Sequence, residues 1–156
     1  MVNCVDFYKS LIMYIFYFSY GHNTNISEFY NRISNAILVG KATLLDYKFT
    51  LEHFANIIPQ KGTSMKGVLW KIPVSAIPTL NYHENYLSKY QHHIVNVIYK
   101  KTIVQALTYV MTPYYKDIRF PTMMYIKWLY QGYKENHLPL LQLKNALKEH
   151  KDVLRY

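Results

Sequence analysis

The feature that most constrains this chain is a change of hydrophobic period about two thirds of the way along its 156 residues. In the first part, runs of aromatic and β-branched residues partly alternate with polar ones, which is typical of strands. Beyond Pro121, apolar residues instead recur at helical spacing, as at Leu140, Leu143 and Leu147. Strands followed by helices predict an α+β domain, with the helices on the outside of a twisted or closed sheet.

Five segments have the composition of strands: Met13–Tyr20, Ala36–Leu51 with an interruption at Gly40, Met65–Ile72 after a turn at Gly62, His93–Tyr99 and Thr102–Met111. Asn25 followed by Glu28 predicts a helix start, because these side chains can cap each other's free backbone N–H groups. A short helical turn is expected at Ser75–Leu80. Two helices close the chain, beginning near Pro121 and Pro139, since proline is tolerated in a first helical turn.

The length suits one domain, and no repeat or flexible linker divides the chain. We therefore predict a single domain over residues 1–156, with residues 1–12 as a peripheral N-terminal extension. The apolar run from Leu11 to Phe18 is shorter than the ~20 residues of a membrane helix and lacks the features of a signal peptide. Cys4 is the only cysteine, which rules out an internal disulfide and predicts a reducing, cytoplasmic compartment without membrane attachment.

The chain is basic, with 18 Lys and Arg against nine Asp and Glu, for a formal net charge of +9. Such a charge attracts anions and is compatible with nucleic-acid binding. However, the basic residues are spread along the chain without a run of like charge or a known nucleic-acid-binding motif. We therefore expect no nucleic-acid partner.

Two places have the residues for chemistry. Tyr20, Gly21, His22 and Asn23 form a loop between a strand and a helix, where free backbone N–H groups can bind an anion, although such a loop is more often only a turn. Glu84 lies among tyrosines in "LNYHENYLSKY", a setting that would desolvate its carboxylate and raise its pKa toward values useful for proton transfer. Spacing alone favours the plainer interpretation, a solvated loop glutamate.

Histidines at positions 83, 92 and 93 do not predict a metal site. No zinc-type spacing is present, and the neighbouring His92 and His93 would point to opposite faces of a strand. We therefore expect no metal.

Several motifs together resemble the γ-glutamylcyclotransferase family, which includes the γ-glutamylamine cyclotransferases and AIG2-like proteins. "YFSYGHNTN" resembles the family loop Y-F-A-Y-G-S-N-L, and "MKGVLWKIP" resembles its V-x-G-V-V-W strand. "LNYHEN" with "KYQHHIVNV" is similar to the L-D-x-x-E-G segment and the strand after it. "LTYVMTPYY" and "FPTMMYIKWLYQGYKENHLP" are similar to the Y-L-M-T strand and the final motif G-A-x-E-x-G-L-P. These matches keep their order over about residues 13–148.

The resemblance implies a compact mixed β-barrel with flanking helices, no cofactor, and a small-molecule γ-glutamyl substrate. The implied reaction cyclises a γ-glutamyl amino acid or amine to 5-oxoproline and releases the amine. Glu84 falls on the family's catalytic glutamate, and the substrate-binding positions fall on Tyr20, Gly21, His22, Asn23, Tyr90, Tyr109 and Tyr125.

This chain departs from the family pattern at three positions of these motifs. His22 stands where the family has serine, Thr24 where it has leucine, and Asn85 where it has glycine. An imidazole is larger than a hydroxymethyl group and can titrate near neutrality, so the pocket can differ in volume and charge. A non-catalytic protein that binds an anionic metabolite or nucleotide in the same cavity therefore remains an alternative, as does a basic interaction module. Monomer and homodimer both remain open.

Overall fold

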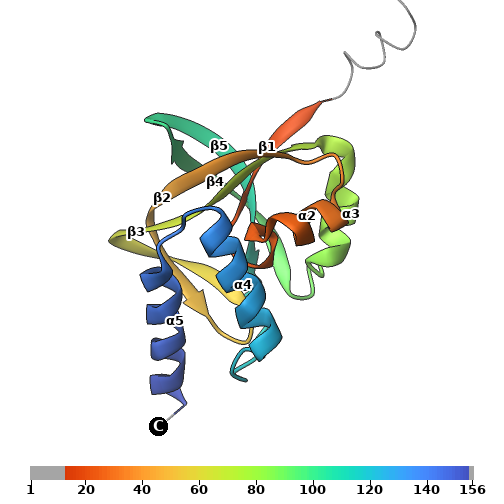
Figure 1. Cartoon of the computed structure of the whole chain (residues 1–156). Helices are drawn as coiled ribbons and strands as arrows, with labels where there is room; N and C mark the ends of the chain where they lie inside the picture. Colours follow the sequence, from red (N-terminus) through yellow and green to blue (C-terminus); the bar gives the residue numbers. More distant parts are fainter. Residues whose placement is uncertain (1–12, 155–156) are drawn as a thin grey trace, which may run out of the picture.

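Five strands form a closed barrel in the computed structural model, which describes residues 13–154 (Figure 1). They are β1 (Tyr14–Ser19), β2 (Ile37–Leu51), β3 (Ala55–Pro73), β4 (Tyr90–Tyr99) and β5 (Thr102–Met111). Around the barrel the order is β1-β3-β2-β4-β5, with antiparallel neighbours except at the closure. There β1 and β5 pair in parallel through Tyr17 and Leu107. The predicted extension and Cys4 lie outside the described residues.

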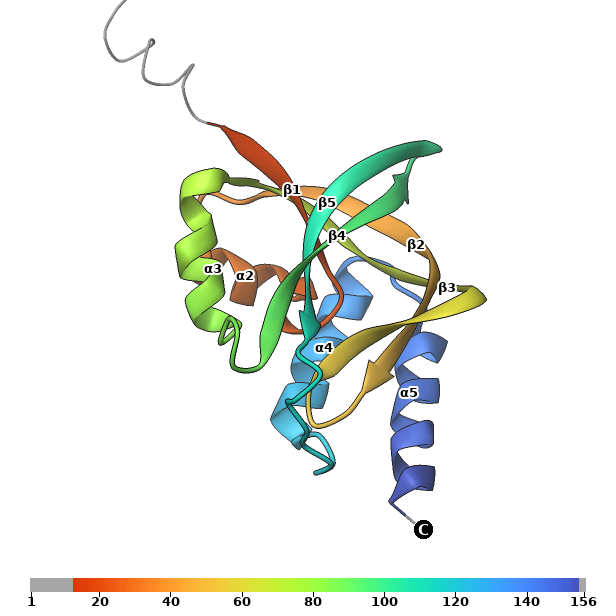
Figure 2. The ribbon, with the colours of Figure 1, turned by 180° about the vertical axis from the view of Figure 1, so that it is seen from behind.

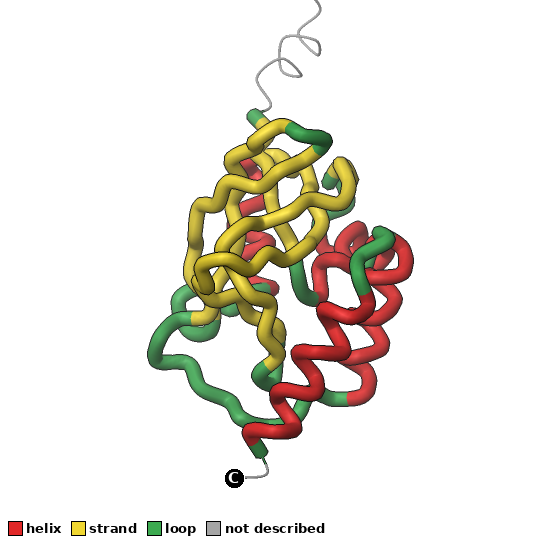
Figure 3. The backbone as a smooth tube through the Cα atoms, turned by 90° about the vertical axis from the view of Figure 1, so that its left-hand side faces the viewer, coloured by secondary structure: helices red, strands yellow, loops and turns green. Residues whose placement is uncertain are grey.

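The helices flank this barrel, and the last two lie next to each other at the C-terminal end of the chain (Figures 1 and 3). The α-helices are α2 (Ile26–Arg32), α3 (Ile77–His83), α4 (Met123–Glu135) and α5 (Leu140–Val153), and the 3-10 helices are η1 (His22–Thr24) and η2 (Val74–Ala76). The predicted α+β class, with a closed sheet and two C-terminal helices, is confirmed. Within the described part of the chain, every helix is too short or too polar to span a bilayer.

The turn predicted at Gly62 is wrong, because this residue lies inside a strand. β3 begins at Ala55 and runs on to Pro73, and it pairs with β2 over residues 55–59 and 64–71. Near Gly62 the register shifts, so that Asp46 alone faces several residues of β3, and the Gly62 N–H donates to Asp46 Oδ1 at 2.9 Å. Both residues have positive φ angles, 84° and 61°, which such an irregularity requires. The interruption expected at Gly40 is likewise a register shift within β2.

Trp70 ties the barrel to the loop that follows β1. Its side chain is completely buried in β3 and packs on Phe29 of α2, with ring centroids 4.5 Å apart. The indole Nε1–H lies within hydrogen-bonding distance of two oxygens, Ser19 Oγ at 3.2 Å and the carbonyl of Asn23 at 3.1 Å. The aromatic core and the loop are therefore positioned by the same side chain.

The start of α2 is held from the other end of the chain. Asn25 caps α2 by accepting from the N–H of Glu28, as predicted. The same asparagine donates to the carbonyl of Trp128 at 3.3 Å, and Asn136 donates to the carbonyl of Thr24 at 2.7 Å. This close approach requires Gly132 in α4, where a Cβ atom would lie 2.3 Å from Thr24 Oγ1.

The two C-terminal helices have their own anchors. Thr122 caps α4 by accepting from the N–H of Tyr125, so Pro121 precedes the helix and does not lie in its first turn. In α5, the Gln142 amide exchanges two hydrogen bonds of 2.8 Å with the backbone of Lys66 in β3. His150 bridges the end of β2 to the irregular segment between β5 and α4, which Figure 2 shows below the barrel.

Candidate active site

A cavity of about 330 Å³ opens where the loop after β1 meets α4 and the end of α3. Its wall takes residues from β1 and the loop after it, η1, α2, the start of β3, the end of α3, β4 and the segment before it, β5 and α4. All eight site residues predicted from the sequence line it: Tyr20, Gly21, His22, Asn23, Glu84, Tyr90, Tyr109 and Tyr125. The fold thus brings together residues that are scattered along the chain.

Glu84 stands at the C-terminal cap of α3, and its side chain is held from the β1 loop. Asn23 Nδ2 donates to Glu84 Oε1 at 2.7 Å. Burial raises the pKa of Glu84 above the ordinary value of a glutamate, while Arg32, the Asn23 hydrogen bond and Lys89 act in the opposite direction. A raised pKa makes a carboxylate a better proton acceptor than that of a solvated loop glutamate, as general acid–base catalysis requires.

Asn85, which replaces the family's glycine, keeps the backbone that this position needs. Its φ angle is 48°, in the left-handed region that glycine adopts freely and that asparagine tolerates better than most residues. Asparagine can therefore occupy this position of the connection from α3 to β4.

The loop residues present both backbone donors and side chains to the cavity. In the 3-10 turn, the N–H groups of Thr24 and Asn25 bond to the carbonyls of Gly21 and His22. Among the described residues, no hydrogen bond uses the backbone N–H of Gly21, His22 or Asn23. These three donors are available to an anionic or carbonyl group of a ligand.

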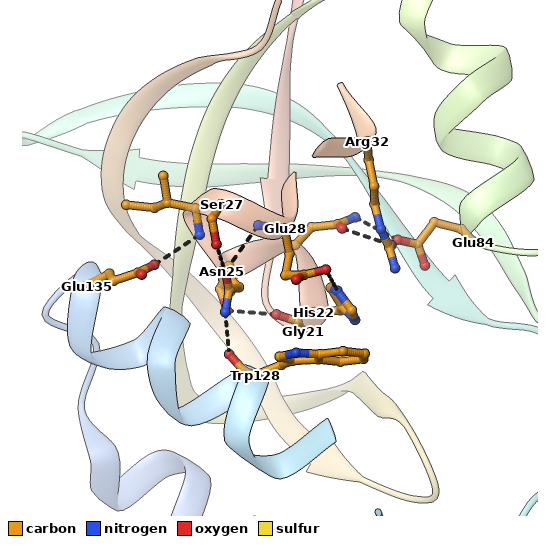
Figure 4. Close-up of polar contacts among 12 residues, drawn as sticks. Gly21, His22, Asn25, Ser27, Glu28, Arg32, Glu84, Trp128 and Glu135 are labelled. Atoms are coloured by element: carbon orange, nitrogen blue, oxygen red, sulfur yellow. Dashed lines mark hydrogen bonds and ion pairs between the residues drawn. The ribbon is translucent and has the colours of Figure 1, made fainter. Parts of the chain in front are cut away.

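His22 is fixed at one side of the cavity rather than projecting across it. Its ring packs against Trp128, with centroids 4.5 Å apart, and its Nε2 lies 3.3 Å from Glu28 Oε2 (Figure 4). Burial and the Arg32 charge lower the pKa of His22, and Glu28 opposes them. The imidazole therefore adds bulk to this wall without a full positive charge at neutral pH.

The predicted tyrosines anchor the wall through hydrogen bonds: three bond to backbone groups, and the Tyr109 hydroxyl donates to Asn81 Oδ1. The Tyr20 hydroxyl donates to the carbonyl of Tyr109, and the Tyr90 hydroxyl donates to the carbonyl of Ala55 at 2.6 Å. The Tyr125 oxygen accepts from the N–H of Ala55 at 3.0 Å. Burial raises the pKa of each of these tyrosines, so they line the cavity as neutral hydroxyls.

Several residues that line the cavity were not predicted from the sequence. Six of them carry a charge or a large aromatic ring: Tyr17, Glu28, Arg32, Phe54, Lys89 and Trp128. Glu28 and Arg32 lie one turn apart on α2, so their side chains share one face of this helix. Because the cap at Asn25 predicts the helix, the sequence could also have indicated that shared face. That this face meets Glu84 depends on how α2 packs on the barrel. Lys89 lies with its ammonium 4.0 Å from the centre of the Phe54 ring, and burial lowers its pKa.

His92 and His93, the neighbouring histidines of β4, bond to side chains. His92 lies 2.7 Å from Asn81 Oδ1, while His93 lies 2.8 Å from the Tyr47 hydroxyl. Within residues 13–154, no three His, Cys, Asp or Glu side chains are grouped so that they could hold a metal ion.

Comparison with known proteins decides the family. Residues 17–130, which include the loop, the cavity tyrosines and Glu84, match the family described as Gamma-glutamyl cyclotransferase, AIG2-like. The chain belongs to this family. Among curated proteins, none matches this sequence significantly.

Solved structures share this fold. One, a Gamma-glutamyl cyclotransferase, is 26% identical with a TM-score of 0.75, and the match covers 92% of this chain and 99% of that one. A human protein described as uncharacterized is 27% identical with a TM-score of 0.73 and the same coverage. YkqA from Bacillus subtilis, at 24% identity and a TM-score of 0.73, shares the fold over 91% of this chain and 56% of its own.

Proposed function

We propose that this protein is a γ-glutamyl cyclotransferase that converts a γ-glutamyl amino acid or amine to 5-oxoproline, with Glu84 as general base and acid. The observation that carries the proposal is the Glu84 carboxylate, which lies in a cavity of small-molecule size with its pKa raised by burial. Membership of the family supports the reaction type.

The proposed reaction uses one carboxylate twice. The substrate's α-ammonium group first loses a proton to solvent, and the neutral amine then attacks the γ-carbonyl carbon. As the new C–N bond forms, Glu84 takes the second proton from the attacking nitrogen. The protonated Glu84 then gives this proton to the departing nitrogen as the original C–N bond breaks. No water is consumed, and Glu84 returns to its starting state.

Holding the substrate in its curled conformation is the second task of the site. Because nucleophile and electrophile belong to one molecule, alignment of the two removes much of the barrier. In the proposal, the free N–H groups of Gly21, His22 and Asn23 hold the substrate's carboxylate or the oxyanion that develops during attack. The Tyr125 hydroxyl, whose oxygen already accepts from Ala55, can donate its proton to the substrate.

A substrate panel tests this function. Purified protein should release 5-oxoproline, measured by mass spectrometry, from at least one member of a panel of γ-glutamyl amino acids and γ-glutamyl amines. Absence of turnover across the panel contradicts the proposal. If a panel member then raises the unfolding temperature without being consumed, the binding alternative is favoured instead.

The pH dependence of turnover should follow the ionisation of Glu84. The substrate's α-amine also titrates, so each kcat/KM value is first divided by the fraction of substrate whose α-amine is neutral. Because the general base must be ionised, this corrected kcat/KM should fall as the pH falls through the raised pKa of Glu84, a drop at higher pH than an ordinary glutamate would give. The measurement is kcat/KM from pH 4 to 9 on the best panel substrate. A profile that stays flat down to the ordinary range of a glutamate would count against a buried base.

A further inference from the structure

Asn23 connects Glu84 to a charged residue outside the set predicted from sequence. The side-chain NH₂ of Asn23 donates to Glu84 Oε1 at 2.7 Å and to the Tyr17 hydroxyl at 3.0 Å. Its carbonyl oxygen accepts from Arg32 Nη1 at 3.0 Å. Figure 4 shows the side chains of Arg32 and Glu84 near one another in the same view. The amide therefore lies between a guanidinium and a carboxylate.

Arg32 is the partner that determines which way this amide faces. A guanidinium has donors only, and an ionised carboxylate accepts only. Reversing the amide would direct Oδ1 at the Glu84 oxygen and the NH₂ group at Arg32, so both contacts would become repulsive. Asn23 itself is 2% exposed, which leaves little water to replace either bond. With one Glu84 oxygen occupied by Asn23, the other is the oxygen available for proton transfer.

The charges around Glu84 also indicate that Arg32 acts on this carboxylate. Burial raises the pKa of Glu84, and Arg32 is the largest of the effects that lower it, ahead of the Asn23 bond and Lys89. Two basic side chains, Arg32 and Lys89, lie on the same wall. The other titratable groups that share the cavity with Glu84 are one carboxylate, two histidines and five tyrosines: Glu28, His22, His83, Tyr17, Tyr20, Tyr90, Tyr109 and Tyr125. Burial raises the pKa of these tyrosines and lowers that of these histidines, so both kinds of side chain favour their neutral forms near neutral pH.

We infer that Arg32 is a positioning residue for the reaction: it fixes the Asn23 amide so that this amide donates to Glu84, and its positive charge favours the ionised form of the Glu84 carboxylate. The inference rests on the proposed function for its catalytic meaning. Its effect on Glu84 itself does not depend on turnover, which allows a separate test.

The test compares Arg32→Met with Lys144→Met, which removes the same charge from an exposed position on α5. Methionine keeps most of the apolar stem of arginine, so the packing of α2 is largely retained. In Arg32→Met, the acidic limb of the kcat/KM profile should move up by about one pH unit or more, because a nearby opposite charge lowers a carboxyl pKa by about that amount. The limb should not move in Lys144→Met. An unmoved limb in a folded Arg32→Met protein overturns the inference.

A second readout keeps the inference apart from the proposed function. The carboxyl ¹³C signal of Glu84, assigned by its absence in Glu84→Gln, reports the ionisation of Glu84 without any substrate. It should titrate at higher pH in Arg32→Met, and Arg32→Lys, which keeps the charge, should restore most of the change. If no γ-glutamyl compound is turned over, the proposed function fails while this titration still decides the role of Arg32. An unchanged titration in both variants contradicts that role.

Discussion

Glu84→Gln is expected to abolish release of 5-oxoproline while leaving the fold intact. The amide has nearly the shape of the carboxylate, and its oxygen can still accept from Asn23 Nδ2, so the cavity keeps its form. It cannot accept a proton from the attacking amine. Loss of general acid and base catalysis lowers kcat by about 10²–10⁴-fold. The unfolding temperature should be unchanged or higher, because a buried carboxylate is replaced by a neutral group.

Glu52→Gln provides the matched control. Burial also raises the pKa of Glu52, but this residue lines a different cavity, beside α5. Its replacement should leave turnover within about twofold of the parent, since surface and remote changes have small effects. Full activity in Glu84→Gln, or equal losses in the two variants, would remove Glu84 from the proposed mechanism.

Gly132→Ala is expected to damage both stability and activity, although residue 132 does not line the cavity. The added Cβ would lie 2.3 Å from Thr24 Oγ1 and 2.7 Å from the backbone nitrogen of Asn25, so α4 and the loop must separate. Overpacking of this kind costs about 2–3 kcal/mol of unfolding free energy. Separation also weakens the bond from Asn136 to Thr24 and displaces the loop that holds Glu84. Urea unfolding and kcat measure the two effects.

Gly62→Asn distinguishes this effect from a general intolerance of glycine replacement. Gly62 has a positive φ, which asparagine tolerates, and no atom lies within 4 Å of a Cβ at this site. Stability and kcat should both stay close to those of the parent. If Gly132→Ala proves as mild as Gly62→Asn, α4 does not hold the loop as tightly as the contacts indicate.

The parts of the fold that could be predicted from sequence are those decided by local chemistry. Asn25 accepts from the Glu28 N–H as predicted, because both residues lie within one helical turn. The reciprocal bond predicted from the Glu28 carboxylate to the Asn25 N–H is wrong: that N–H donates to the His22 carbonyl, and the carboxylate lies beside the His22 ring. The start of β3 could not be predicted, since Pro59 and Gly62 are poor strand formers and the strand continues there only through pairing with β2 on both sides of the register shift.

In the candidate site, too, some residues can be predicted from local sequence motifs and others only from how the elements pack. The family motifs lead to Glu84 and the loop, and the structure places these residues around one cavity. No sequence motif points to Arg32. Its importance comes from its hydrogen bond to Asn23, which forms only because α2 packs on the barrel. Whether the eight predicted residues have the roles assigned to them remains a prediction for the variants above.

The way the barrel closes also bears on how the site comes to exist during folding. Thr108 Oγ1 on β5 donates to the carbonyl of Phe18 on β1, across 90 positions of sequence, and the bond from Asn136 to Thr24 spans 112. Contacts between such distant segments form slowly, because a long loop must be ordered before they can contribute. The pocket around Glu84 should therefore be among the last parts of the molecule to acquire its final shape. A chain that ended before α4 would lack one of its walls.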